Sequence, residues 1–201
     1  MDYQLFKAIN GLAGRNAIAD AVMKAFATWG PEISLLVAAL IWFLPGRLTT
    51  RGLERRVVIY ALLTAAIGLG LNQVISHAWA RPRPSAAHAV TLLLGGSSDP
   101  SFPSDHATLV IGLALPVLIY LRRWGVLLLV MAALISFARI YVGRHYPGDI
   151  LGSAAVAFAA TMLVWSLRGR LEWLIAPILK LLVPLRLADR SDVPLPPALL
   201  R

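Results

Sequence analysis

The chain has 201 residues, a length that suits one ordinary domain. Its composition is 58% hydrophobic and only 14% charged, with a mean hydropathy of +0.71, which excludes an ordinary water-soluble globular fold. Lys and Arg outnumber Asp and Glu by 19 to 10, an excess that belongs to the loops of a membrane protein and indicates no nucleic-acid partner. The chain has no cysteine, which excludes disulfides, thiol catalysis and cysteine-ligated metals, so any chemistry rests on His, Arg, Asp and Ser.

The N-terminal residues 1–24 mix apolar side chains with acidic and basic ones, and Gly11 and Gly14 interrupt them. This pattern predicts an amphipathic helix that lies in the membrane interface. The segment lacks the continuous apolar core of a signal peptide, so we expect it to be retained.

Five apolar segments then approach the roughly 20 residues that a helix needs to cross about 30 Å of hydrocarbon. They predict transmembrane helices at about 25–44, 57–76, 104–121, 124–142 and 148–167. Residues 171–185 contain two prolines, a Glu and a Lys among apolar side chains, which favours a C-terminal interfacial helix. We expect residues 188–201 to form a loose tail. The predicted fold is an all-α, polytopic membrane helical bundle that forms one domain over residues 1–187.

Basic residues fall mostly on one face of such a bundle. With five crossings, the loop after the first span, the turn at 122–123 and the segment from 168 onward share one face, which holds twelve of the 19 Lys and Arg. The positive-inside rule assigns that face to the cytoplasm. Beyond the N-terminal segment, four basic residues fall on the outer face and need another explanation: Arg81, Arg83, Arg139 and Arg144.

Three polar segments reach this outer face together. They are residues 81–84 at the end of the second span, 101–106 at the start of the third, and 139–149 between the fourth and fifth. Polar and ionisable residues at membrane depth are costly and usually functional. The topology therefore predicts one shared site.

The residue types at this site indicate phosphoryl transfer. Arginines, a Ser hydroxyl and the free amides of a helix that starts near Ser104 would bind a tetrahedral oxyanion. His106 and His145 can supply a nucleophile and a proton donor, and Asp149, four residues after His145, can hold its imidazole. Because arginines take the role of a cation, we expect neither a metal nor another cofactor.

Each residue also has an ordinary structural interpretation. Arg81 and Arg83 could anchor lipid headgroups, Asp105 could belong to a plain helix cap, and His145 could be an interfacial histidine. Arg144 could bind phosphate or a neighbouring acid. Two further histidines, His77 and His88, could contact substrate or nothing. The three motifs together favour the functional interpretation.

These motifs resemble those of a known family. Arg83-Pro84, residues 103–106 and the Arg139-x5-His145-x3-Asp149 pattern are similar to the three signatures of the type 2 phosphatidic acid phosphatase superfamily. The surrounding sequence, over roughly residues 3–167, is closer still to bacterial undecaprenyl-pyrophosphate phosphatases of the bacitracin-resistance type.

The resemblance implies a role for each residue. His145 would attack phosphorus and form a phosphohistidine, Asp149 would be its partner, and His106 would protonate the leaving group. Phosphate oxygens would be bound by Arg83, Ser104 and Arg139, with Arg81, Asp105 and Arg144 as further phosphate-binding candidates.

The sequence departs from the superfamily pattern at three positions. Ser76 stands where the first signature usually has Lys, Asp105 replaces the usual Gly of the second, and Ala138 replaces the Ser that precedes the third. One positive charge is therefore absent, and Arg81 is a candidate to replace it.

The resulting hypothesis is a multi-pass lipid-diphosphate phosphatase of a bacterial inner (cytoplasmic) membrane that acts on undecaprenyl pyrophosphate at the outer, periplasmic face. Alternatives with the same chemistry are another lipid phosphate, such as phosphatidylglycerol phosphate or lipid A, or phosphoryl transfer to a lipid acceptor. A bundle whose four histidines ligate haem or a metal, such as a metal-dependent transporter, is a different class, which the histidine spacing and the adjacent arginines disfavour. The lipid substrate and the membrane are the expected partners, and no obligate protein partner is indicated.

Overall fold

The computed structural model describes residues 1–44 and 51–192. These residues form helices joined by loops: α1 (Asp2–Asn10), α2 (Ala17–Phe43), α3 (Arg51–Ala78), α4 (Pro84–Ala87), α5 (Asp105–Tyr120), α6 (Arg122–Tyr141), α7 (Pro147–Leu182) and the short 3-10 turn η1 (Arg190–Asp192).

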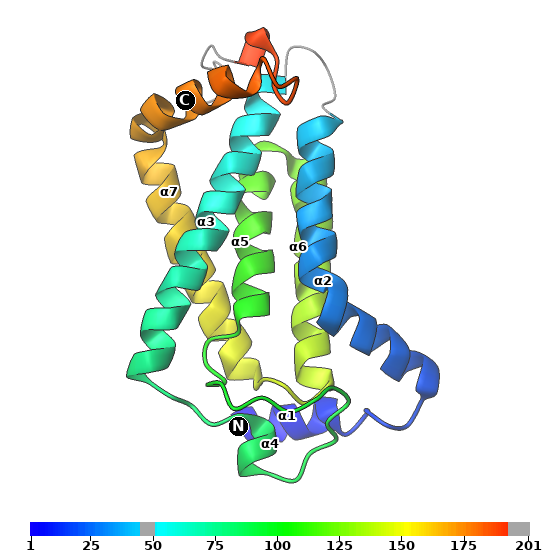
Figure 1. Ribbon diagram of the computed structural model, residues 1–201. Coiled ribbons are helices and arrows are strands. Elements are labelled where there is room, and N and C mark those ends of the chain that lie inside the picture. The colour runs from blue at the N-terminus through cyan, green and yellow to red at the C-terminus, as the bar shows by residue number, and fades with distance from the viewer. Residues whose placement is uncertain (45–50, 193–201) are drawn as a thin grey trace.

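Five long helices form an upright bundle with α5 at its centre (Figure 1). Helix α5 packs against α2, α3, α6 and α7. Of the helices in the described residues, α2, α3, α6 and α7 are long and apolar enough to cross a membrane, and α5 is a shorter apolar helix of 16 residues. The predicted all-α, polytopic membrane bundle is confirmed.

Helices α5 and α6 form a very tight hairpin. Helix α6 begins at Arg122, two residues after α5 ends, and a Cβ atom at Gly125 would overlap the backbone of Leu118. Glycine therefore lets the two helices approach closely at this turn.

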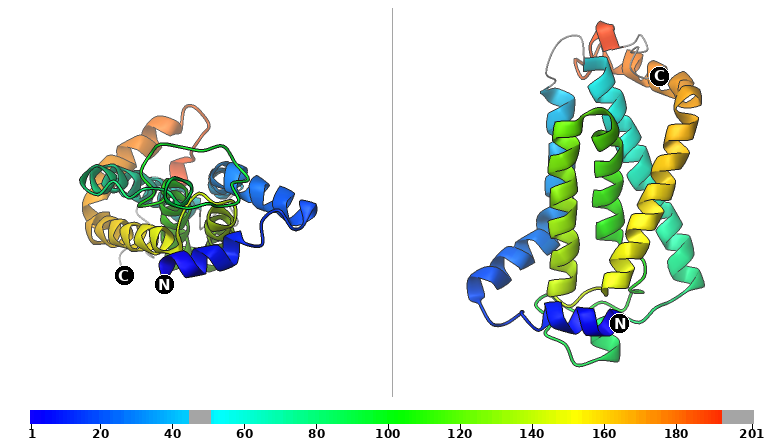
Figure 2. Two further views of the ribbon diagram at one scale, coloured as in Figure 1. Left: turned by 90° about the horizontal axis from the view of Figure 1, so that it is seen from below. Right: turned by 180° about the vertical axis from the view of Figure 1, so that it is seen from behind.

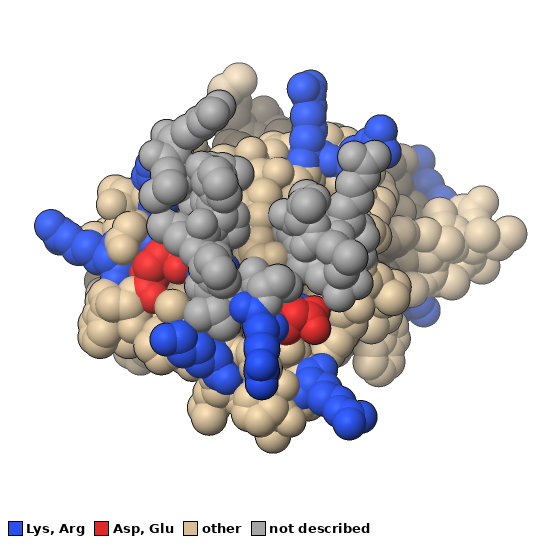
Figure 3. All heavy atoms as spheres, turned by 90° about the horizontal axis from the view of Figure 1, so that it is seen from above, with Lys and Arg blue, Asp and Glu red and all other residues tan. Residues whose placement is uncertain are grey.

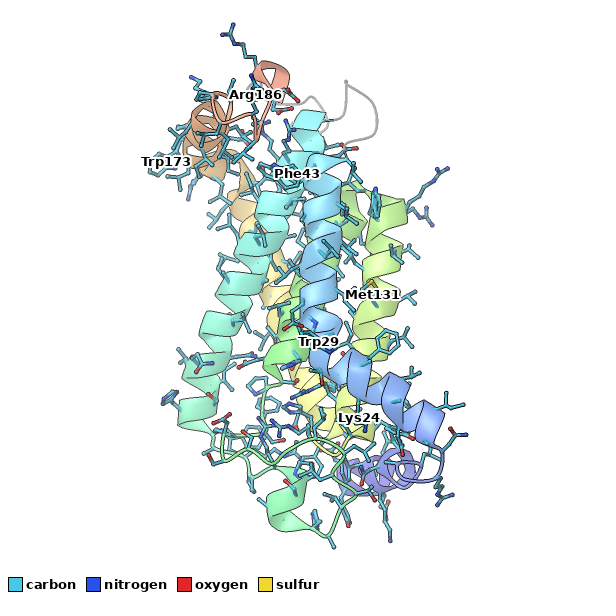
Figure 4. The ribbon with its side chains drawn as sticks, turned by 45° about the vertical axis from the view of Figure 1, so that its right-hand side comes forward. Lys24, Trp29, Phe43, Met131, Trp173 and Arg186 are labelled. Carbon is cyan, nitrogen blue, oxygen red and sulfur yellow. The ribbon has the colours of Figure 1, made fainter. Side chains whose placement is uncertain are left out.

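The N-terminal segment divides differently from the prediction. Residues 1–24 are not one helix, because α1 ends at Asn10 and α2 already begins at Ala17. Asn16 caps α2, its side chain accepting hydrogen bonds from the amides of Ile18 and Ala19 at 2.9 and 3.0 Å. In Figure 4 the part of α2 that carries Lys24 leans away from the bundle, whereas the end at Phe43 stands upright.

The fifth span and the C-terminal helix are one helix of 36 residues, α7. No proline separates the predicted segments, so the backbone hydrogen bonds continue through residues 168–170. Figure 2 shows the last part of α7 lying across the end of the bundle. There Glu172 pairs with Arg56 of α3 at 3.0 Å. Of the predicted tail, 188–192 are described and Asp192 pairs with Arg55, while 193–201 lie outside the described residues.

The two ends of the bundle carry different sets of polar residues. Figure 3 shows Lys and Arg side chains around the end that carries the α5–α6 turn and the last part of α7. The three polar segments lie at the opposite end, beside the N-terminus and α1 (Figure 1). The predicted separation of the basic face from the site is thus present in the fold.

Candidate active site

The three polar segments surround a cavity of about 650 Å³. Helix α3, the loop that follows it, the start of α5 and the α6–α7 connection supply its polar lining: Gln73, Ser76, His77, Arg83, Asp99, Asp105, His106, Arg139, Arg144 and His145. Arginine and histidine dominate this wall, so the cavity suits an anion.

His145 lies in the turn between α6 and α7 and is only 2% exposed. The turn depends on Gly143, whose φ of 85° favours glycine. The Nδ1 atom of His145 lies 2.8 Å from the carbonyl oxygen of Ser101. Because a carbonyl only accepts hydrogen bonds, Nδ1 carries the proton and Nε2 keeps a free electron pair.

Burial also keeps this imidazole uncharged. It lowers the pKa of His145 to about 4, and the cationic neighbours Arg139 and Arg83 act in the same direction, while Asp149 opposes them. At neutral pH the ring is therefore neutral, which is the form that can attack an electrophile.

Arg83 and Arg139 approach the free nitrogen of His145. Arg83 Nη1 lies 3.3 Å from Nε2, and Arg139 Nη2 lies 3.5 Å from it. Arg83 Nε donates to the carbonyl of Asp99 at 2.9 Å, and Arg139 Nη1 donates to that of Ala27 at 3.1 Å. These bonds to backbone fix both guanidinium groups in place beside the imidazole.

Two guanidinium nitrogens in this wall have no partner in the structure. The Nε atoms of Arg139 and Arg144 are buried without a hydrogen bond. A buried donor left unpaired is costly, and such a donor often awaits a ligand. Both atoms are also closed off from solvent, so an oxyanion in the cavity could reach them only after a local rearrangement.

Asp149 is fully buried at the first turn of α7. Its Oδ2 atom accepts hydrogen bonds from the Tyr146 amide at 2.8 Å and from the Ser101 hydroxyl, and lies 3.6 Å from His145 Nδ1. Ser101 thus connects the pair, since its carbonyl accepts from His145 while its hydroxyl donates to Asp149. Asp149 stands beside the imidazole without holding it directly.

Arg81 lies outside the cavity wall. Its Nη1 atom donates to Asp149 at 2.7 Å, and its Nη2 atom donates to Asp2 of α1 at 2.6 Å. In this structure the guanidinium of Arg81 serves two carboxylates and does not replace the absent signature Lys at position 76 on the cavity wall.

The second motif starts helix α5. Ser104 is fully buried as the N-cap, where its hydroxyl accepts from the amide of Ala107 at 3.5 Å. Asp105 and His106 follow on the cavity wall. Asn72 of α3 holds Asp105 through a 2.8 Å hydrogen bond. Within the described residues, no group of three His, Asp or Glu is placed to hold a metal ion.

The remaining two histidines differ in position. His77 lines the cavity, where its Nδ1 atom lies 2.6 Å from the carbonyl of Gln73. His88 stacks on Tyr3 of α1, with ring centroids 3.7 Å apart, and does not line the cavity.

Sequence reasoning missed several supporting residues. Ser101 opens the second motif, yet only the fold shows that it bridges His145 and Asp149. Ser153 of α7 accepts a hydrogen bond from the Ser104 amide at the start of α5. It lies one helical turn after Asp149, and this spacing could have indicated its supporting role. Asp2 gave no signal, because only the docking of α1 brings it to Arg81.

A match to a protein-family model identifies the family of this chain. The model of the PAP2 superfamily matches residues 56–173, which contain all three polar segments. The chain belongs to the PAP2 superfamily. This PAP2 chain is 35% identical over 183 residues to undecaprenyl-diphosphatase BcrC of Bacillus subtilis (strain 168), covering 91% of the chain and 90% of that relative. It is 32% identical over 120 residues to the putative undecaprenyl-diphosphatase YbjG of Escherichia coli (strain K12), covering 58% and 61%.

A solved structure shares the PAP2 fold. The crystal structure of Aquifex aeolicus LpxE matches with a TM-score of 0.67 and 23% identity, covering 81% of this chain and 93% of that one. The family resemblance predicted from the motifs is confirmed, and the protein is a multi-pass membrane protein.

Proposed function

We propose that this PAP2 protein hydrolyses the terminal phosphate of undecaprenyl diphosphate through a phosphohistidine on His145. The observation that carries the proposal is the unprotonated Nε2 atom of a buried His145, faced by Arg83 and Arg139 at 3.3 and 3.5 Å. A neutral nucleophile beside preorganised guanidinium groups suits attack on a phosphate.

In the first step Nε2 attacks the terminal phosphorus, and the bond between that phosphorus and the bridging oxygen breaks. Arg83, Arg139 and Arg144, which line the cavity, stabilise the charge on the transferring phosphoryl oxygens. The imidazole becomes a cationic phosphohistidine, whose charge is balanced by the neighbouring Asp149. Arginines thus supply the positive charge that a metal ion supplies in other phosphatases.

His106 acts as proton donor in the first step and as proton acceptor in the second. It lines the same cavity and donates a proton to the departing lipid monophosphate. In the second step neutral His106 accepts a proton from the water that attacks the phosphohistidine, which releases inorganic phosphate and restores His145.

The lipid substrate is proposed from the relatives. BcrC is named an undecaprenyl-diphosphatase and matches 91% of this chain. YbjG is named a putative undecaprenyl-diphosphatase. We place the protein in a bacterial inner membrane with the cavity on the outer face, because the basic residues gather at the opposite end of the bundle.

The test measures phosphate release from undecaprenyl diphosphate, phosphatidylglycerol phosphate and lipid A by purified protein. His145→Ala should lower turnover by at least about 10³-fold and abolish an acid-labile phosphoenzyme, because the nucleophile is gone. His106→Ala should reduce turnover of a lipid monophosphate ester more than that of nitrophenyl phosphate, whose leaving group scarcely needs a proton.

His88→Ala is the matched control, because this histidine stacks on Tyr3 away from the cavity wall, and it should retain activity. A phosphoenzyme trapped on folded His145→Ala protein would overturn the proposed nucleophile. Preference for another lipid in the panel would overturn the proposed substrate alone.

A further inference from the structure

We propose that Asp2 of α1 is a positioning residue that, by pairing with Arg81, keeps Arg81 from fully neutralising Asp149. This inference rests on the proposed function, since it assigns Asp149 to the support of His145. It extends the site to the N-terminal helix, which lies across the end of the bundle beside the three polar segments (Figure 1).

Arg81 is shared between two carboxylates. Its Nη1 atom pairs with Asp149 at 2.7 Å and its Nη2 atom pairs with Asp2 at 2.6 Å. Asp149 is fully buried, and the side chain of Arg81 is 23% exposed. One cation between two anions leaves this group of three with a net negative charge.

That net charge matters for catalysis. If Arg81 paired with Asp149 alone, the pair would be neutral and would stabilise a cation on His145 only weakly. Asp2 adds a second negative charge beside Arg81 and so offsets its positive charge. Asp149 then keeps the negative potential that the cationic phosphohistidine needs at a distance of 3.6 Å.

The geometry fixes Asp2 in this position. Its Oδ1 atom accepts a hydrogen bond from the amide of Gly148 at 2.8 Å, at the start of α7. A Cβ atom at Gly148 would lie only 2.8 Å from an Asp2 carboxylate oxygen, so glycine makes room for this contact. The Arg81 guanidinium also lies over the ring of Tyr146, with its Cζ atom 4.2 Å from the ring centre.

Helix α1 has other contacts that hold it in place. Phe6 is 1% exposed and packs on Tyr146, with ring centroids 5.5 Å apart. Asn10 donates to the carbonyls of Thr91 and Tyr141, each at 2.8 Å. Removing the charge of Asp2 should therefore leave α1 docked, so its electrostatic role is separable from folding.

The experiment compares Asp2→Asn with two controls. Asp20→Asn makes the same chemical change in an acid that contacts Gly14 and Tyr141 and not Arg81. Asn10→Ala removes a docking contact of α1 without touching the charges. Each purified variant is assayed for kcat, KM, melting temperature and the pH dependence of kcat/KM.

For Asp2→Asn we expect a fall in kcat on the order of 10- to 100-fold, smaller than for a direct triad partner, with KM and melting temperature nearly unchanged. The acid limb of the pH profile should move to lower pH, because less negative charge near His145 disfavours its protonated form. The other charged or titratable groups that line the cavity with this ring remain as they are: His77, Arg83, Asp99, Asp105, His106, Arg139 and Arg144.

Asp20→Asn should behave as the unmodified protein, and Asp2→Asn should add no further loss when Arg81 is already Ala. Unchanged kcat in Asp2→Asn would overturn the inference. The inference would also be overturned if the fall in kcat came with a lowered melting temperature, as expected for Asn10→Ala, and without a shift of the acid limb. Failure of the proposed function would appear separately, as a phosphoenzyme that persists in His145→Ala.

Discussion

His145 combines two properties that a nucleophilic imidazole needs. The carbonyl of Ser101 fixes its tautomer by accepting the Nδ1 proton at 2.8 Å, and burial keeps the ring uncharged. The neighbouring carboxylate reaches the same ring only at 3.6 Å. A backbone carbonyl, which side-chain mutation cannot remove, therefore orients the proposed nucleophile, and we expect Asp149 to contribute mainly charge.

The lowered pKa of His145 predicts activity in mildly acidic solution. Because the ring becomes protonated only as the pH falls through about 4, kcat/KM should stay high at pH 6, where an ordinary histidine with a pKa of 6.5 would be mostly protonated and unable to attack. Below the limb, kcat/KM should fall about tenfold per pH unit. The measurement is kcat/KM between pH 3.5 and 8.

Ionisation of the substrate phosphate is the confounding process, because its second pKa lies near 6. Two substrates with different phosphate pKa values separate the causes, since an enzyme-derived limb keeps its position. A limb at pH 6.5 with both substrates would show that His145 is solvated in the working enzyme.

At the scale of helices, Ser153 connects α5 to α7. Its hydroxyl oxygen lies 2.8 Å from the Ser104 amide, from which it accepts, and within 3.0 Å of the carbonyls of Ser104 and Asp149. The site residues of both helices are therefore held by one buried side chain. Small residues at such a crossing let membrane helices approach closely.

Ser153→Ala should destabilise the protein by about 1–3 kcal/mol, because the buried amide of Ser104 would lose its acceptor. Ser166→Ala is the matched control, since that exposed serine of α7 bonds only the carbonyl of Leu163, at 2.9 Å. Thermal unfolding in detergent measures both variants. Equal melting temperatures would mean that water or a backbone shift replaces the Ser153 hydroxyl.

The sequence predicts the membrane helices from their apolar runs, but it places some of their ends wrongly. Helix α2 starts at Ala17 and α7 continues to Leu182, because a helix need not stop where the hydrocarbon ends. Fixed motif spacing made His145 predictable as part of a site. The sharing of Arg81 with Asp2 was not predictable, since it depends on contacts across 79 positions of the chain.

At the scale of the whole molecule, basic side chains gather at both ends of the bundle, and only one of these ends holds the cavity. Arg122 and Arg123 lie at the turn opposite the site, and at that same end the ion pair between Arg56 and Glu172 joins α3 to the last part of α7. At the other end the basic side chains Arg83, Arg139 and Arg144 line the cavity. In the proposed function, positive charge directs membrane orientation at one end and binds an anion at the other.

This division predicts the topology in cells, and the absence of cysteine makes the test direct. Gly96→Cys places a thiol in the loop that follows α4, where a Cβ atom meets nothing within 4 Å, and Arg123→Cys places one at the exposed α5–α6 turn. An impermeant thiol reagent should label Gly96→Cys in intact cells. If the cells have an outer membrane, spheroplasts are used instead. The reagent should label Arg123→Cys only after permeabilisation, because the positive-inside rule predicts that the basic end faces the cytoplasm. The unmodified protein controls for background, and the reverse pattern would place the cavity on the cytoplasmic face and contradict the proposed orientation.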